Sequence, residues 1–216
     1  MVPAHMEKFY IGGAWVTPHS SARMGVENPA TEEIVAEVAL GNVGDVDAAV
    51  AAARAAFDAY TVWPVERRIA LVKRVLEVYN SRYEDVAQAV STEMGAPITW
   101  AREAQAWAGQ VHLEATIKAA EEMVWEHTAG TTRIIHEGIG VCALITPWNW
   151  PLNQIVCKVA PALIAGCTMV LKPSEIAPLS GVLFAEICHE AGVPAGVFNL
   201  VNGTGPEVGA RMSSHP

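Results

Sequence analysis

The sequence predicts an α/β fold built around a doubly wound parallel sheet, with a region of short strands and helices before it. Three almost wholly apolar runs, at residues 141–145, 168–171 and 197–201, alternate with segments of helical character. Continuous apolar strands are typical of parallel sheets that are buried on both faces. The intervening segments, residues 151–165 and 179–191, each precede a glycine and are long enough for right-handed crossovers, so they predict connecting helices.

The composition predicts a globular protein that binds neither nucleic acid nor membrane. Of 216 residues, 51% are hydrophobic and 17% are charged, which supplies enough apolar material for a core. The net charge of −9 would repel nucleic acids and acidic lipids. The longest apolar stretch, residues 155–171, contains a lysine and a proline and is shorter than the ~20 residues of a membrane-spanning helix.

The amino-terminal third predicts antiparallel strands followed by helices. Residues 9–16 and 25–40 surround turn-forming Gly-Gly and Asn-Pro pairs and predict short strands. From residue 46, apolar residues recur every three or four positions behind Asp45, which is a good helix cap. The pattern therefore predicts a first helix after the strands.

Three further helices are predicted before residue 124. Pro64 opens one of them at a first-turn position, and the next covers about residues 83–94, where Gly95 stops it. On the last helix, Trp100 and Trp107 share a face. Such an aromatic stripe is more typical of a packed core than of a cofactor site, so we expect both rings to be buried.

Residues 126–140 predict an exposed ribbon. Residues 133–137 mix charged and branched apolar side chains, and Gly138 and Gly140 follow them. A ribbon with one apolar face suits pairing with another subunit, although a simple edge strand has the same pattern.

Ligands of a doubly wound sheet lie beyond the carboxyl ends of its strands, which here are followed by residues 146–151, 172–175 and 202–209. In the second stretch, Glu175 can accept hydrogen bonds from ribose hydroxyls, and Lys172 can reach a hydroxyl or a phosphate. The alternative is a solvated loop whose glutamate caps the next helix. The residues alone leave both interpretations open.

The glycines of the third stretch would let the backbone approach a phosphate or an adenine group. However, Glu207 near the start of the following helix opposes an anion, so a capped helix after a turn is an equally good interpretation. The turn after the first parallel strand contains no glycine, and a standard pyrophosphate loop is therefore absent.

Asn149 lies between two tryptophans in the first stretch. Local chemistry favours a helix-capping or turn role for it. The functional alternative is that its amide donates a hydrogen bond to a developing oxyanion, in a site that the flanking rings keep partly dry.

The cysteines and histidines predict neither disulfides nor a metal site. No spacing among the four cysteines or the seven histidines matches a disulfide framework or a metal site. We expect reduced cysteines with packing roles and, because the opening lacks a signal-peptide pattern, a cytoplasmic protein. The cysteines lie at positions 142, 157, 167 and 188.

The sequence resembles the NAD(P)-dependent aldehyde dehydrogenase superfamily, specifically its amino-terminal portion. The motifs that carry the resemblance are PWNWP at residues 147–151, KPSE at 172–175 and the run at 196–205, in that order and spacing. Residues 9–15 and 28–31 are similar to the opening of that family, so the likeness covers nearly all of the chain.

The resemblance implies a Rossmann-type cofactor domain, a separate catalytic domain and a bridging oligomerisation ribbon. Residues 1–125 would form the amino-terminal strands and helices, 126–140 the ribbon, and 141–216 the first part of the sheet. The family oxidises aldehydes to carboxylic acids through a cysteine thiohemiacetal, hydride transfer to NAD(P) and thioester hydrolysis. A homo-oligomer, dimer or tetramer, is expected.

By the same resemblance, Asn149 matches the asparagine that stabilises the oxyanion. Lys172 and Glu175 would hold the adenosine ribose, and NAD is expected over NADP because Glu175 would repel a 2′-phosphate, although Lys172 nearby weakens that inference. The residues expected at the cofactor are Ile145, Thr146, Pro147, Trp148, Lys172, Ser174, Glu175, Gly205 and Gly209.

The chain ends at Pro216, before the family's general-base glutamate and nucleophilic cysteine, so we expect it to be inactive alone and to bind NAD poorly. The competing hypothesis is a non-catalytic nucleotide-binding or assembly fragment. A mass near 23.0 kDa for the purified protein would support the fragment, whereas a mass about twice as large or more would indicate a complete enzyme.

Overall fold

The structure is a computed structural model that describes residues 2–216. Its main sheet has five strands in the order β2-β1-β9-β8-β7. The three parallel strands are β7 (Val141–Ile145), β8 (Thr168–Lys172) and β9 (Phe198–Leu200), close to the predicted apolar runs. The hairpin β1 (Phe9–Ile11) and β2 (Ala14–Val16) adds to β9 in antiparallel orientation, which the sequence did not predict.

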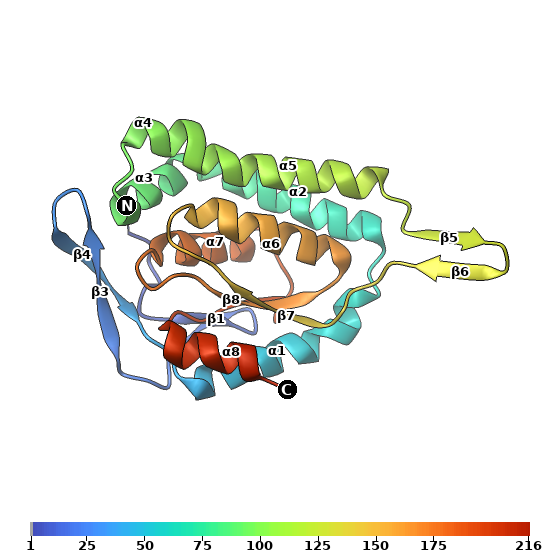
Figure 1. The fold of residues 1–216 in the computed structure, drawn as a ribbon, viewed down its shortest axis with the longest axis horizontal. Coiled ribbons are helices and arrows are strands. Elements are labelled where there is room, and N and C mark those ends of the chain that lie inside the picture. The colour runs from blue at the N-terminus through green and yellow to red at the C-terminus, as the bar shows by residue number, and fades with distance from the viewer. Residues whose placement is uncertain (1) are drawn as a thin grey trace.

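Helices cover both faces of this sheet (Figure 1). The two predicted crossover helices, α6 (Pro151–Ala165) and α7 (Leu179–Glu190), lie on one face. The other face is covered by α1 (Val43–Thr61), together with the π-helical segment η2 (Gly205–Gly209) and α8 (Ala210–Ser214). A further layer over α6 consists of α2 (Val65–Ser81) and α5 (Trp107–Glu122).

The start of α1 differs from the prediction. Its N-cap is Asn42, whose side chain accepts hydrogen bonds from the N–H groups of Gly44 and Asp45. Asp45 accepts in return from the Asn42 N–H at 3.0 Å. Asp45 is therefore the third helical residue of a reciprocal capping box and not the cap itself.

The expected burial of the aromatic stripe is wrong. Trp100 and Trp107 are 51% and 54% exposed. The predicted last helix is divided into α4 (Ile98–Trp100), the π-helical segment η1 (Ala101–Ala106) and α5, so a single α-helical repeat does not hold along it. The residues of η1 and α5 that are buried instead are Ala101, Gln105, Ala106, Gly109, Leu113, Ile117 and Ala120. Gly109 packs closely on α2, because a Cβ there would lie 2.4 Å from the Tyr79 hydroxyl.

The burial of one of the three parallel strands, β7, also differs from the prediction. All residues of β8 and β9 are buried, as expected. Strand β7 is only half-buried, with Ala143 and Ile145 exposed, because no strand among residues 2–216 lies beyond it in the sheet.

Two hairpins project from the body of the molecule (Figure 1). The first pairs β3 (Arg23–Asn28) with β4 (Glu33–Ala39), as the sequence predicted. The second is the predicted ribbon, β5 (Glu126–Ala129) and β6 (Thr132–Ile135), and every residue of its strands is exposed. Within residues 2–216, no helix combines the length and the apolar character needed to cross a bilayer.

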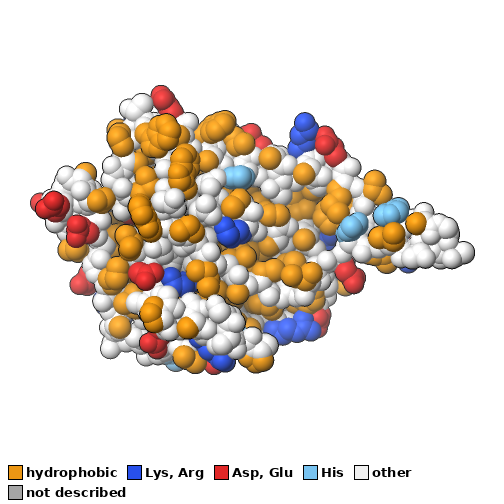
Figure 2. All heavy atoms as spheres, viewed as in Figure 1, with side chains coloured by type: hydrophobic (Ala, Val, Ile, Leu, Met, Phe, Trp, Pro, Cys, Tyr) orange, Lys and Arg blue, Asp and Glu red, His pale blue; other side chains and the backbone are white. Residues whose placement is uncertain are grey.

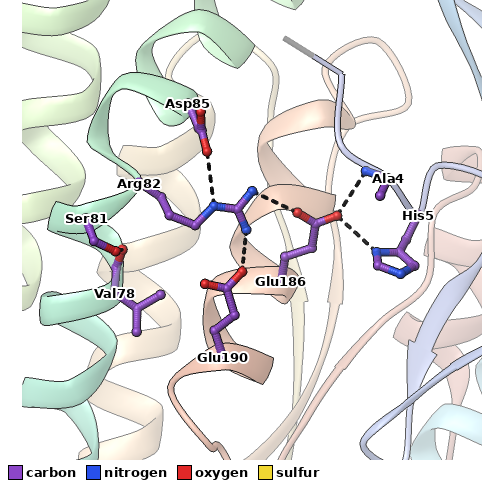
Figure 3. A network of polar contacts seen from close by, with 8 residues as sticks. All are labelled: Ala4, His5, Val78, Ser81, Arg82, Asp85, Glu186 and Glu190. Carbon is purple, nitrogen blue, oxygen red and sulfur yellow. Dashed lines mark hydrogen bonds and ion pairs between the residues drawn. The ribbon is translucent and has the colours of Figure 1, made fainter.

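A polar network joins the amino-terminal segment and the α2–α3 junction to α7 (Figure 3). Arg82 lies between α2 and α3 (Tyr83–Met94) and pairs with Asp85 at 3.2 Å, Glu186 at 3.1 Å and Glu190 at 2.7 Å. Glu186 also lies 3.0 Å from Nδ1 of His5. One guanidinium thereby holds three carboxylates from two parts of the chain.

A buried carboxylate on α3 holds the amino-terminal end of α7. Glu93 accepts hydrogen bonds from the N–H groups of Leu179 and Ser180, at 2.5 and 3.0 Å, and from the Ser180 hydroxyl. These bonds satisfy helix N–H groups that have no partner within α7. Burial nevertheless raises the pKa of Glu93 to about 7, against the opposing effect of the hydrogen bonds.

This raised pKa predicts a specific pH dependence of stability. Between the ordinary pKa of 4.5 and about 7, the folded protein binds a proton at Glu93 more tightly than the unfolded chain does, so its stability falls as the pH rises through this window. In Glu93→Gln, which cannot titrate there, this fall should be smaller by on the order of 3 kcal/mol. Urea unfolding at several pH values measures the difference. Glu77→Gln, which removes an exposed carboxylate from α2, should keep the slope of the unmodified protein, and an identical slope in Glu93→Gln would refute the assignment.

Candidate functional site

The three stretches singled out by the sequence meet at one edge of the sheet. Ile145 pairs with Lys172 at the ends of β7 and β8. The Thr146 N–H donates to the Lys172 carbonyl at 3.1 Å. Because β9 runs parallel to β8, its following loop reaches the same edge.

An ion pair forms the centre of this edge. The Lys172 side chain is buried, and its Nζ lies 3.0 Å from Oε2 of Glu175 and 2.9 Å from the Pro173 carbonyl oxygen. Partial burial of Glu175 works against its ionisation. The backbone N–H groups of Glu175 and Gly205, together with Lys172, outweigh that effect and hold the pKa of Glu175 below its ordinary value. Glu175 is therefore a carboxylate that joins the loops after β8 and β9.

The glycines of the third stretch have two different roles. A Cβ at Gly203 would lie 2.3 Å from Cγ2 of Val208, so this position requires glycine for packing. Gly205 faces open space, whereas a Cβ at Gly209 would lie 3.8 Å from Cδ of Lys172 and 4.0 Å from Cδ1 of Ile145. Gly209 thus faces the same side chains that form the edge.

Ser174 has a local role in this loop. Its hydroxyl accepts a hydrogen bond from the Ile176 N–H at 3.3 Å, and its carbonyl accepts from the Ala177 N–H at 3.2 Å. The serine shapes the turn that presents Glu175.

The turn that contains Asn149 is more open than the sequence suggested. Pro147, Trp148 and Asn149 are all exposed. The N-cap of α6 is Trp150 and makes no side-chain capping bond, so the capping role that local chemistry favoured for Asn149 is wrong. No described residue hydrogen-bonds to the Asn149 amide, which leaves its donor free.

The neighbouring rings do not enclose Asn149. Trp150 packs edge-on against Trp100, with ring centroids 6.1 Å apart, and Trp148 is 52% exposed. Hydrophobic side chains gather over the end of the molecule that carries α4 and the start of α6 (Figure 2). This surface lies beside the asparagine turn.

Two buried polar side chains in these loops have no partner. The Thr146 hydroxyl and both amide atoms of Asn202 are buried without a hydrogen bond. Such groups are costly unless something else bonds to them. Asn202 opens the third stretch singled out from the sequence, but no role was predicted for its side chain, and the only available signal was its position directly after a buried strand and before a glycine.

These features fit a nucleotide cofactor. The Lys172–Glu175 pair offers a donor and an acceptor side by side, which suits ribose hydroxyls. The unpartnered groups of Thr146 and Asn202 provide further hydrogen-bonding capacity at the same edge, and Gly205 leaves room for close approach. Among residues 2–216, no three histidine, cysteine or acidic side chains gather in a way that could hold a metal ion.

Comparison with curated proteins identifies the relatives of this chain. Residues 15–216 match the model of the aldehyde dehydrogenase family. A 3-succinoylsemialdehyde-pyridine dehydrogenase from a Pseudomonas species is 51% identical over 210 residues, which make up 97% of this chain and 44% of that protein. The chain thus spans less than half the length of this relative.

Solved structures agree with this match. An aldehyde dehydrogenase C variant from Pseudomonas syringae, in complex with NAD+ and octanal, has a TM-score of 0.97 and 52% identity over 100% of this chain and 45% of its own. An aldehyde dehydrogenase from Bartonella henselae has a TM-score of 0.95 and 47% identity over 97% of this chain and 45% of its own. A betaine aldehyde dehydrogenase from Staphylococcus aureus, in complex with NAD+, has a TM-score of 0.92 and 30% identity over 97% of this chain and 43% of its own. The chain belongs to the aldehyde dehydrogenase family.

Proposed function

We propose that this chain is the amino-terminal, cofactor-binding part of an enzyme that oxidises an aldehyde to a carboxylic acid with NAD. The observation that carries the proposal is the Lys172–Glu175–Gly205 cluster at the carboxyl edge of a parallel sheet. Two similar structures, from Pseudomonas syringae and Staphylococcus aureus, contain NAD+, and the first also contains octanal. These relatives support the cofactor and the class of substrate.

Several residues at this edge would hold NAD in different ways. Bound NAD would supply the hydride acceptor. Glu175 accepts from the ribose hydroxyls, and Lys172 donates to one of them while keeping Glu175 ionised. Ser174 supports their loop. Ile145, Thr146, Pro147 and Trp148 would line the cofactor site, and Gly205 and Gly209 would lie near the adenine.

Asn149 binds the oxygen of the aldehyde. Its amide is free, lies on the turn directly after β7, and can donate to negative charge that develops on that oxygen. None of the chain's cysteines is placed to attack the aldehyde. Cys142 lies near the amino-terminal end of β7 and Cys167 lies directly before β8, away from the carboxyl edge that carries Asn149. Cys188 is buried in α7, and Cys157 donates to a carbonyl within α6. We therefore expect the chain alone not to oxidise aldehydes.

Replacing Asn149 in the complete enzyme tests its role. Asn149→Ala should lower kcat by ~10²-fold or more, because a hydrogen-bond donor to the oxyanion is lost, while the KM for NAD stays nearly constant. Aldehyde-dependent formation of NADH measures both quantities. Asn80→Ala, an exposed asparagine on α2, should change neither. Unchanged turnover in Asn149→Ala would remove the residue from the mechanism.

Glu175 predicts the choice of cofactor. A carboxylate at the ribose repels a 2′-phosphate, so kcat/KM should be higher with NAD than with NADP. Glu175→Gln should reduce that ratio by roughly tenfold, because the repulsion disappears while one acceptor oxygen remains. Glu77→Gln removes an exposed charge from α2, outside the three stretches of the edge, and should leave the ratio nearly constant. A preference for NADP in the unmodified enzyme would contradict this proposal.

We also propose that the complete protein is a cytoplasmic homo-oligomer. All four cysteines are free, as expected in a reducing compartment. The ribbon exposes Ile134 and Ile135 on a two-stranded sheet whose edges are open, and pairing with another subunit would satisfy both features.

A single charge on the ribbon should weaken this association. Ile135→Asp would place a carboxylate in the proposed interface, so sedimentation should show a smaller species than the unmodified complete protein. The matched control is Ile34→Asp, because Ile34 is an exposed isoleucine on the other hairpin. A monomeric unmodified protein, or equal dissociation by both variants, would exclude the ribbon as the interface.

A further inference from the structure

We propose that Cys142 and Cys167 form a redox-active thiol pair that a hydroperoxide converts reversibly to a disulfide between β7 and β8. The pair lies at the amino-terminal ends of these strands, opposite the edge that carries Glu175 and Asn149. It is therefore separate from the proposed cofactor site, and the proposal stands independently of that site.

Strand register brings the two thiols together. Cys142 on β7 pairs with Met169 on β8. Cys167 lies directly before β8, two positions before Met169, so continuing the strand alternation by one residue places its side chain on the same face of the sheet as Cys142. Each thiol is the largest influence on the pKa of the other, which is consistent with side chains that are neighbours. Cys142 is half-buried beside the larger hydrophobic cluster, and Cys167 is buried.

A buried arginine next to this pair lacks an acidic partner. Arg68 on α2 is 6% exposed, and no carboxylate among residues 2–216 lies within ion-pair distance of it. Its Nη1 donates to the Thr61 carbonyl at 3.0 Å, but its Nε has no partner. A Cβ at Gly166, directly before Cys167, would lie 2.7 Å from the same Nη1. A buried cation without a counter-charge is costly, and a thiolate at Cys167 would supply that charge.

The other titratable groups around Arg68 do not replace this anion. Tyr60 on α1 donates its hydroxyl proton to the Leu163 carbonyl at 2.9 Å, and burial raises the pKa of Tyr60, so the phenol stays neutral. Glu66, on the first turn of α2, is exposed and affects the pKa of Arg68 only through longer-range charge interaction.

The surroundings select Cys167 as the ionised member of the pair. A hydrogen bond from the Cys142 thiol lowers the pKa of Cys167, and the N–H groups of Ile139 and Gly140 and the Arg68 charge act in the same direction, against the effect of burial. The same contact raises the pKa of Cys142, which remains the protonated partner. Nucleophilic attack therefore begins at Cys167.

The reaction balances with a hydroperoxide as the two-electron oxidant. The Cys167 thiolate attacks one peroxide oxygen, the O–O bond breaks, and a sulfenic acid forms while hydroxide, or an alkoxide from an organic peroxide, takes up a proton. The Cys142 sulfur then attacks the Cys167 sulfur, its proton passes to the leaving hydroxyl group, and water is released. Overall, two thiols and one hydrogen peroxide give one disulfide and two waters, and a dithiol reductant restores the pair.

Peptide mapping without reduction tests the proposal. The folded chain is treated with hydrogen peroxide, quenched in acid with a maleimide and digested with trypsin. We expect a cross-link between the peptides that contain Cys142 and Cys167, which dithiothreitol removes. Because no lysine or arginine separates Cys142 from Cys157, both fall on one tryptic peptide, and variants must assign the bond.

The cysteine variants make that assignment. The cross-link should persist in Cys157→Ser and Cys188→Ser and vanish in Cys142→Ser, where a sulfenic acid at Cys167 should instead react with dimedone. In urea, the unfolded chain should favour the shorter loop between Cys157 and Cys167, because closing a shorter loop costs less entropy. A native chain that links Cys157 or Cys188, or that keeps Cys142 and Cys167 as free thiols, would overturn the proposal.

Arg68 variants test the source of reactivity. Arg68→Met should slow cross-linking by about fivefold or more, since the thiolate loses its neighbouring charge. Arg68→Lys should recover much of the rate, which separates loss of charge from loss of fold. Arg67→Met is the matched control, because Arg67 is the next residue on α2, is exposed and lies over the Trp63 ring at 3.4 Å. Equal rates in Arg68→Met, Arg67→Met and the unmodified chain would refute the role of Arg68.

Discussion

The burial of β8 between two layers of helices is the constraint on which the rest of the structure depends. Every residue of this strand is buried, including the lysine at its carboxyl end. Because a buried ammonium group needs a partner, Lys172 draws Glu175 back onto the sheet, and Glu175 in turn accepts from the loop after β9. The packing of one central strand therefore assembles the polar edge.

The elements that depend on local patterns could be predicted from the sequence. Strand β7 and helices α3 and α6 have the predicted limits because apolar runs, first-turn prolines and terminal glycines act within a few residues of where they stand. The addition of β1 to β9 could not be predicted, since it depends on a contact between residues 190 positions apart in the chain, Tyr10 and Leu200.

In the candidate site, too, some features could be predicted from the sequence and others could not. The sequence identified the three stretches, because the carboxyl ends of parallel strands are fixed once the strands are known. It did not reveal that Asn149 is exposed or that Asn202 is buried without partners, because both properties depend on the packing of loops from different strands. The expected burial of Trp100 and Trp107 was wrong for a related reason. The π-helical η1 interrupts the α-helical repeat, and the face that packs closely on Tyr79 carries Gly109, which leaves both tryptophans exposed.

Strand β7 stands at the border of the sheet with one row of backbone N–H and C=O groups unpaired among the described residues. Its carboxyl end is also where Ile145 and Thr146 meet the polar edge. A strand that paired along β7 would bury Ala143 and Ile145 and would form a wall directly beside a bound nucleotide. Completion of the sheet and occupancy of the edge would therefore be thermodynamically linked to the extent that the added strand contacts the ligand.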